Sequence, residues 1–278
     1  MLALKRVKVV KIRLDGNGEI VALDKNGCIL VLGEQPYQSE FQQVITESIN
    51  CLSALLNKNL HSIYIYGSVA KGQATPYKSD LDLCVIVNQP VNQIEVSHLA
   101  QLQVTLASDY QVVSKVDFDI GTYSDVMDKT NLYSWGYWIK HHCRCLYGDD
   151  LSKKFMPFLP SKKIVDAVNG DFLEVLNGYI HQIDTCRDLT KRKFLQRAAS
   201  RKLIRSTDLL RKEADKDWPD SLEDYVQKII QRYPKQKRPI QYFLAQAREP
   251  SAHDQQFTFH LYEFMNWLSY ERDHITKF

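Results

Sequence analysis

The most constraining feature of this sequence is residues 61–87, HSIYIYGSVAKGQATPYKSDLDLCVIV. The first part, 61–66, alternates apolar and polar residues and is rich in β-branched and aromatic side chains, which predicts a strand. Gly67-Ser68 interrupts this pattern and predicts a turn. The run 81–87 is almost entirely apolar, as in a buried central strand. The stretch therefore predicts two strands joined by a Gly-Ser turn, a short helix and a loop.

Two aspartates stand at the start of the second predicted strand. Asp80 and Asp82 are two residues apart, so on a strand both carboxylates point to the same face. Such a pair on a buried strand costs free energy unless a cation offsets its charge. Mg²⁺ is the natural candidate, because it prefers one or two carboxylates together with substrate phosphates.

The spacing of these residues resembles a known family signature. Gly67-Ser68 is followed by eleven residues and then by Asp80-Leu81-Asp82, which is similar to the DNA polymerase β-type nucleotidyltransferase superfamily. The full motif, GSVAKGQATPYKSDLDL, is most similar to the small stand-alone members, which include antibiotic-modifying enzymes and the minimal nucleotidyltransferases. The resemblance implies that the Gly-Ser turn holds a triphosphate and that the two aspartates bind metal, which we expect to be two Mg²⁺ ions or Mn²⁺ in their place.

The resemblance also implies a third metal-binding or catalytic carboxylate on a nearby strand. The predicted strand 112–122 contains Asp117 and Asp119, which share one face. Asp117 has more of the strand after it, whereas Asp119 precedes a glycine, as in some relatives. Both aspartates stay candidates at this point.

Further residues are candidates for binding the nucleotide. Gly67 allows the backbone to approach phosphates closely, Ser68 offers a hydroxyl, and the helix expected to start near Val69 would point N–H groups at an anion. Lys71 flanks the loop and either contacts phosphates or is solvated. The complete set of candidate nucleotide-binding residues is Gly67, Ser68, Lys71, Ser79, Arg201 and Arg205.

Around this motif the sequence predicts three domains. An N-terminal β-meander (1–36) precedes an α/β (α+β) nucleotidyltransferase domain with a small mixed sheet (37–156), and an all-α domain (157–278) follows. Turn sequences in the meander and an apolar spacing typical of helices in the other two domains support this division. The expected strands are 5–14, 19–23, 28–32 and 112–122, besides the two of the motif, and the expected helices before the boundary are 39–56, 91–108 and 133–147.

Pro157 and Pro160 mark the boundary of the C-terminal domain, where we expect helices at 161–188, 190–214, 221–232, 238–248 and 255–274. The second of these helices has two stripes. An apolar stripe predicts a buried face, and it consists of Leu195, Ala199, Leu203, Ser206 and Leu210. Arginines at four-residue steps form the other stripe, Arg197, Arg201 and Arg205. This basic stripe is either a solvated face or a contact for the triphosphate.

Composition narrows the class of protein. The chain is 44% hydrophobic and 25% charged, as in globular proteins, and has no run near the roughly 20 apolar residues that span a bilayer. Lys and Arg interrupt the apolar residues at the N-terminus, so these residues do not form the apolar core of a signal peptide. We therefore expect a cytoplasmic protein that does not bind membranes. A net charge of +3 is too small to indicate nucleic-acid binding. Six scattered cysteines predict reduced thiols. A zinc site is not favoured at the cluster of His141, His142, Cys143 and Cys145, because no second ligand pair follows at zinc-finger spacing.

Together with these features, the resemblance implies a Mg²⁺-dependent enzyme that transfers a nucleoside monophosphate, AMP from ATP, to a hydroxyl of a small acceptor such as an antibiotic, with release of pyrophosphate. Two alternatives stay open: transfer to a protein or RNA, as in toxin-neutralising minimal nucleotidyltransferases, and an inactive nucleotide-binding module. All three carboxylate positions are present, which favours the active enzyme. The acceptor, the base of the nucleotide and the oligomeric state are not specified by the sequence.

Overall fold

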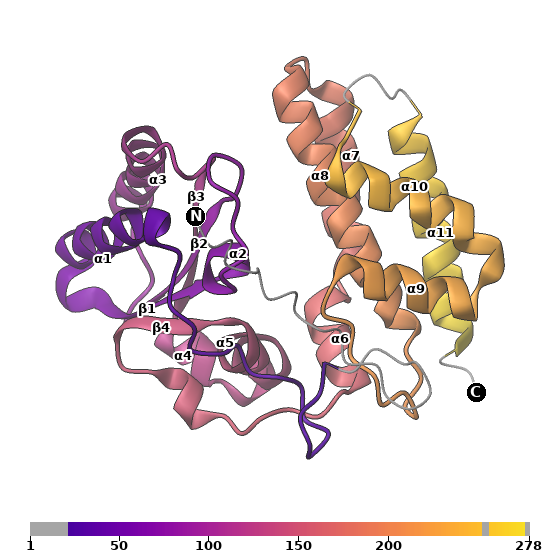
Figure 1. Ribbon diagram of the computed structural model, residues 1–278, viewed down its shortest axis with the longest axis horizontal. Helices are drawn as coiled ribbons and strands as arrows, with labels where there is room; N and C mark the ends of the chain where they lie inside the picture. The colour runs from indigo at the N-terminus through magenta and orange to yellow at the C-terminus, as the bar shows by residue number, and fades with distance from the viewer. Residues whose placement is uncertain (1–21, 252–255, 276–278) are drawn as a thin grey trace, which may run out of the picture. The chain divides into compact units, whose positions relative to one another are not determined.

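The computed structural model describes residues 22–251 and 256–275 of the chain (Figure 1). It divides into two compact units, one formed by Ile29–Phe158 and the other by the described residues up to Cys28 together with those from Leu159 onward. The three-domain division expected from the sequence stays a prediction, because much of its first domain lies in residues 1–21, outside the described part. Within the described residues, no helix is both long and apolar enough to cross a membrane.

The first unit, Ile29–Phe158, is built on a small mixed sheet, as predicted. Its strands are β1 (Leu60–Tyr66), β2 (Leu81–Val87), β3 (Val116–Thr122) and β4 (Arg144–Gly148). They lie in the order β3-β2-β1-β4, in which β1 pairs antiparallel with β2 and β4, and β2 pairs parallel with β3. The parallel pair is possible because α3 (Gln93–Asp109) crosses over between its strands. The Gly-Ser turn opens α2 (Gly67–Ala70), which is only four residues long.

Helices cover both faces of this sheet (Figure 1). On one face α1 (Gln42–Leu56) and α3 pack their apolar side chains against alternate residues of β1 and β2, such as Ile63, Leu83 and Val85. The residues between them on the same strands, such as Tyr64 and Cys84, pack on the other face against shorter helices. These are α4 (Tyr123–Met127), a π-helical segment Leu132–Gly136 and α5 (Tyr137–His142). Both sides of β2 are therefore buried, which explains its continuous apolar run.

Two segments of this unit differ from the sequence-based expectation. The helix expected at 133–147 ends at His142, and the chain continues as β4, because Arg144–Gly148 pairs with β1 instead of continuing the helix. The strand expected at 28–32 is reduced to a bridge at Ile29, whose N–H donates to the carbonyl of Phe158 at 2.8 Å. Both differences arise from pairing with segments far away in the sequence. The strand expected at 5–14 and most of that at 19–23 lie outside the described residues.

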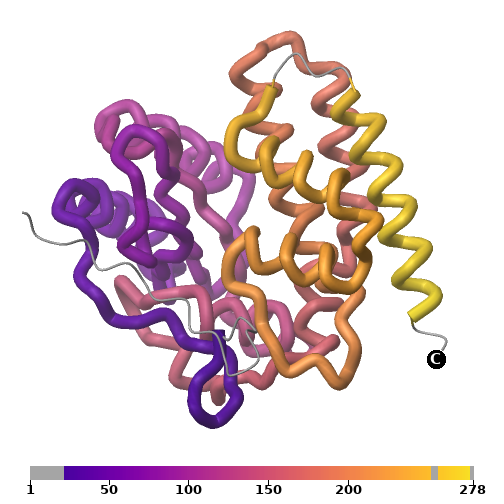
Figure 2. The backbone as a smooth tube through the Cα atoms, turned by 45° about the vertical axis from the view of Figure 1, so that its right-hand side comes forward, coloured from indigo at the N-terminus to yellow at the C-terminus, as the bar shows by residue number. Residues whose placement is uncertain are grey.

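The second unit is helical, as expected for the C-terminal part. Its helices include α6 (Lys162–Asn169), α7 (Phe172–Thr185), α8 (Leu189–Ser206), α9 (Leu222–Arg232), α10 (Lys237–Arg248) and α11 (Phe257–Ile275). The single helix expected at 161–188 is split between α6 and α7 at Gly170 and Asp171. Figure 2 shows α8 running along α7 and α10, with which it is in contact. The helix expected at 190–214 ends at Ser206, and Thr207–Leu210 forms a short 3₁₀-helix after it. All five residues of the predicted apolar stripe are buried, with Leu210 in the 3₁₀-helix, whereas Arg201 and Arg205 are exposed.

Candidate active site

Four aspartates gather at the end of the sheet where β1 finishes and β2 and β3 begin. The register of the sheet places Asp82 of β2 beside Tyr66 of β1 on one side and beside Asp117 of β3 on the other. Asp80 stands one residue before β2, and Asp119 stands two residues beyond Asp117. Side chains two residues apart on a strand share a face, so the four carboxylates face the same side of the sheet. We call Asp80, Asp82, Asp117 and Asp119 the carboxylate corner.

The Gly-Ser turn lies directly against this corner. Gly67 adopts a φ of 74°, in the left-handed region that favours glycine. A Cβ atom added to Gly67 would lie 2.2 Å from Oδ2 of Asp82, far inside van der Waals contact. Two independent constraints, backbone conformation and available space, therefore require glycine here. The structure thus brings together the two halves of the sequence motif, Gly67 and Asp82.

The carboxylates of the corner influence one another electrostatically. Burial, together with the negative charges of Asp80, Asp117 and Asp119, raises the pKa of Asp82 to about 7, while Lys115 opposes this rise. A carboxylate with this environment accepts a proton or a cation readily, because either relieves the repulsion.

Three polar residues that the sequence analysis did not single out hold the other carboxylates. Ser114 Oγ donates to Asp80 Oδ1 at 2.5 Å, Lys115 Nζ lies 2.5 Å from Asp117 Oδ1, and the hydroxyl of Tyr66 donates to Asp119. Burial and Asp119 raise the pKa of Tyr66, so its hydroxyl stays protonated as a donor. Tyr66 directly precedes Gly67, and Ser114 and Lys115 directly precede β3. Their positions next to the ends of these strands are the sequence signal that could have identified them as partners of the carboxylates.

The donor chemistry of the corner suits a hard divalent cation. Within residues 22–251 and 256–275, however, no group of three or more His, Cys, Asp or Glu side chains is arranged to hold a metal ion. These two observations agree if the ion is bound by one or two carboxylates and completes its coordination with substrate phosphates and water, as is usual for Mg²⁺. Asp80 and Asp82 fit that role, because Asp82 lies against the Gly67 turn, Asp80 stands two residues before it, and the negative charge of Asp82 is destabilised by burial.

The sequence cluster around His141 is not arranged for zinc. The buried ring of His141 has one nitrogen, Nε2, accepting from the N–H of Phe158 at 2.9 Å and the other, Nδ1, 3.2 Å from the carbonyl of Leu30. Both ring nitrogens are thus used in hydrogen bonds that tie this segment together. The role of His141 in the fold is structural.

The remaining predicted residues lie at different places. Ser68 is half-buried in α2, and Lys71 is its C-cap residue. Ser79 uses its hydroxyl to accept the N–H of Thr75 at 2.8 Å, which closes the loop before β2. Arg201 and Arg205 lie on α8, in the other compact unit. Nucleotide binding by these residues stays a prediction.

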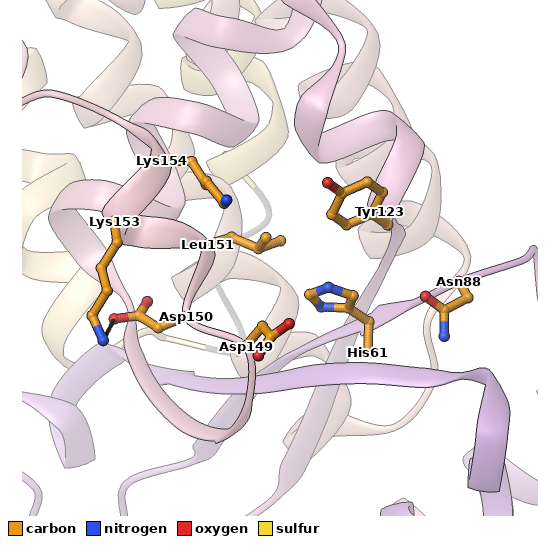
Figure 3. Close-up of a pocket in the computed structure, with 8 residues that line it drawn as sticks. All are labelled: His61, Asn88, Tyr123, Asp149, Asp150, Leu151, Lys153 and Lys154. Atoms are coloured by element: carbon orange, nitrogen blue, oxygen red, sulfur yellow. Dashed lines mark ion pairs between the residues drawn. The ribbon is translucent and has the colours of Figure 1, made fainter.

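A cavity of about 610 Å³ opens at the opposite end of the same sheet (Figure 3). Its walls come from the start of β1, from residues just after β2, β3 and β4, and from 149–154; they include His61, Tyr123 and Lys154. The rings of His61 and Tyr123 are in contact, with centroids 5.0 Å apart. A seven-residue strand spans roughly 20 Å, so this cavity is separate from the carboxylate corner, and none of the predicted site residues lines it.

Comparison with known proteins identifies the motif and the fold. Residues 46–140 match the family described as Nucleotidyltransferase domain. No curated protein sequence gives a significant match. The fold is similar to that of spectinomycin adenyltransferase AAD(9) from Enterococcus faecialis, solved with ATP and spectinomycin, with a TM-score of 0.57 and 14% sequence identity over 82% of this chain and 98% of that chain. The family match spans β1, the Gly-Ser turn and the four aspartates of the corner.

Proposed function

Because this chain contains a nucleotidyltransferase domain and is an enzyme of that type, we propose that it transfers AMP from ATP to a hydroxyl of a small-molecule acceptor and releases pyrophosphate. The observation that carries the proposal is the direct contact between the Gly67 turn and Asp82. This contact joins a backbone suited to phosphates with carboxylates suited to a divalent cation. The active-site assignment and its Mg²⁺ dependence are part of the proposal.

Each group of the corner has a distinct role in this reaction. The Gly67-Ser68 turn binds the triphosphate through its backbone and the Ser68 hydroxyl, since no side chain at Gly67 obstructs the approach. Asp80 and Asp82 would hold Mg²⁺, which when bound neutralises phosphate charge and fixes the triphosphate. The acceptor hydroxyl attacks the α-phosphorus and loses its proton to a carboxylate, and the bond to pyrophosphate breaks. Most of the rate enhancement then comes from positioning and charge neutralisation.

The structure favours Asp117 over Asp119 as the third carboxylate. Asp117 is the direct neighbour of Asp82 across the parallel pair of strands, whereas Asp119 lies opposite Cys84. Both aspartates have a partner, since Asp119 accepts a hydrogen bond from Tyr66 and Asp117 pairs with Lys115, but Lys115 is exposed and its ion pair with Asp117 is screened by solvent. We therefore assign proton acceptance or metal binding beside Asp82 to Asp117.

This assignment predicts unequal effects of two matched substitutions. Asp117→Asn is expected to lower kcat by about a hundredfold or more, as loss of a general base does. Asp119→Asn keeps an acceptor for Tyr66 and is expected to lower kcat by less than about tenfold. Steady-state kinetics of both purified variants at saturating nucleotide measure the difference. The reverse order would move the third carboxylate to Asp119, and two slight effects would place it elsewhere in the chain.

ATP and a small acceptor are proposed on two grounds. The structurally similar spectinomycin adenyltransferase was solved with ATP and spectinomycin, which supports a nucleotide and a small molecule as the two substrates here. The modest net charge of +3 gives no electrostatic reason to prefer an RNA acceptor. We propose a cytoplasmic location for the reaction, as the sequence predicts.

The direct test is mass spectrometry of possible acceptors after incubation with the purified enzyme, Mg²⁺ and each of ATP, GTP, CTP and UTP. The panel should contain hydroxylated antibiotics, a tRNA pool and purified proteins, with Asp82→Asn as the inactive control. An added AMP mass on a small molecule, together with pyrophosphate, is the expected result. An added mass confined to RNA or protein would overturn the small-molecule acceptor, and no added mass on any of them would contradict the proposed activity.

A further inference from the structure

The segment before α1 is attached to the loop that follows the Gly-Ser turn. We call residues 35–38 the strap. The side chain of Gln38 bonds both backbone groups of Ala74: its Nε2 donates to the carbonyl at 3.0 Å and its Oε1 accepts the N–H at 2.9 Å. Gln35 Nε2 donates to the carbonyl of Lys71 at 2.7 Å. The strap therefore holds the loop at two points, through side chains that lie 36 residues before their partners.

Arg144 of β4 joins the strap to the end of α2. Its Nη1 donates to the carbonyl of Gln35 at 2.6 Å and to the carbonyl of Ala70, the last residue of α2, at 3.4 Å. Its guanidinium lies over the ring of Tyr37, with Cζ 4.1 Å from the ring centroid. Arg144 is the only arginine in the sequence between residues 29 and 158. The planar guanidinium can donate and stack at the same time, which lysine cannot.

Hydrogen bonds within the loop connect these points of attachment to the Gly-Ser turn. The N–H of Lys71 donates to the carbonyl of Gly67 at 3.2 Å, and the N–H of Gln73 donates to the carbonyl of Ser68 at 2.9 Å. Gly72, between these two residues, also has a left-handed φ of 65°. A loop with two such glycines has many accessible conformations when it is not held in place, and ordering it upon binding costs free energy.

We propose that Arg144 and the strap are positioning residues for the nucleotide: they hold the Gly67-Ser68 turn in the conformation that binds the triphosphate before the ligand arrives. The inference rests on the proposed function, because it takes the turn as the triphosphate site. It extends that function to residues outside the sequence motif, namely the strap before α1 and Arg144 on β4. Arg144 contacts the strap and the last residue of α2 and not the carboxylate corner, so its substitution acts through the turn.

Substitution of Arg144 should separate nucleotide affinity from turnover. Arg144→Ala is expected to raise the Kd for the α,β-methylene analogue of ATP, measured with Mg²⁺ by isothermal titration, by about tenfold, in line with the loss of one or two hydrogen bonds. KM for ATP should rise in parallel, while kcat at saturating ATP stays within about twofold. Arg144→Lys should give an intermediate Kd, because it keeps the charge but loses the stacking of the guanidinium on Tyr37.

A purely structural role gives a different result. In that case Arg144→Ala would lower the melting temperature and the active fraction, so that kcat falls while Kd per active site is unchanged, and this outcome would overturn the inference. If Arg144→Ala does not fold, Gln38→Ala decides in its place, with Gln43→Ala, an exposed glutamine on α1, as the matched control. A raised Kd for Gln38→Ala alone supports the strap, and equal Kd values for both overturn it.

The proposed function can fail independently of this inference. Wild-type protein that binds the ATP analogue but transfers no nucleotide would contradict the proposed function, while the variants still test the strap. Equal Kd values of the analogue for the wild type, Arg144→Ala and Gln38→Ala would contradict the role of the strap alone. Absence of binding in the wild type would overturn both.

Discussion

Asp82→Asn is expected to abolish nucleotidyl transfer and, at the same time, to make the protein more stable above about pH 7. The loss of activity follows from the position of Asp82 between the Gly67 turn and Asp117, where an amide cannot replace a carboxylate toward a cation. The gain in stability follows from the same position, since the carboxylate is buried among like charges. A substitution that stabilises the fold and removes the activity is characteristic of a functional site.

The pH dependence of this stability has a definite sign. The pKa of Asp82 is about 7 in the folded protein, against about 3.9 in an unfolded chain. Between these values the folded state holds a proton that the unfolded state has lost, so the free energy of unfolding of the wild type decreases as the pH rises. Asp82→Asn removes this decrease. The variant should be more stable than the wild type by about 1–4 kcal/mol above pH 7 and nearly equal to it below about pH 4.

Urea denaturation in the presence of EDTA at several pH values measures this difference. Asp109→Asn, an exposed aspartate at the end of α3, is the matched control and should change neither stability nor activity. Addition of Mg²⁺ and ATP should raise the melting temperature of the wild type and leave that of Asp82→Asn unchanged. Near-wild-type turnover of Asp82→Asn would show that the carboxylate corner is not the active site.

Gly67→Ala is expected to have the second largest effect. The added methyl group would place Cβ 2.2 Å from Asp82 Oδ2, so either the turn or the carboxylate must move. The left-handed backbone adds strain of about 1–3 kcal/mol for a residue with a side chain. A displacement of about 1 Å at reacting groups can cost about a hundredfold in rate. We therefore expect kcat/KM to fall by about a hundredfold or more, with a moderate loss of stability.

Gly72→Ala separates the two causes of this effect. Gly72 has nearly the same backbone conformation, with a φ of 65°, but a Cβ there would meet only the Gln35 side chain, at 3.9 Å. This variant therefore has the strain without the clash, so its loss of stability should not exceed that of Gly67→Ala, while its kcat/KM falls by less than about tenfold. Melting temperatures and steady-state kinetics of both variants test this. Equal losses of activity would attribute the effect to strain in the loop and not to the contact with Asp82.

The sequence by itself determined the central part of the candidate site. The strands β1 and β2, the turn between them and the pair Asp80 and Asp82 were all predicted, because their signals are local: alternation on a strand, a glycine at a turn and a two-residue spacing. The buried stripe of α8 was predicted for the same reason, since its period is that of a helix. These patterns depend only on residues that are close together in the sequence.

Only the tertiary structure decided which distant residues meet the motif. The parallel register of β2 and β3 placed Asp117 rather than Asp119 beside Asp82, and a register is set by pairing across 35 residues of chain. The pairing of Arg144–Gly148 with β1 turned an expected helix into a strand and brought Arg144 to the end of α2. Tyr66, Ser114 and the strap likewise act through hydrogen bonds to residues 34 to 53 positions away. Local patterns carry no information on such contacts, because the partner, and not the residue, determines the free energy of the bond.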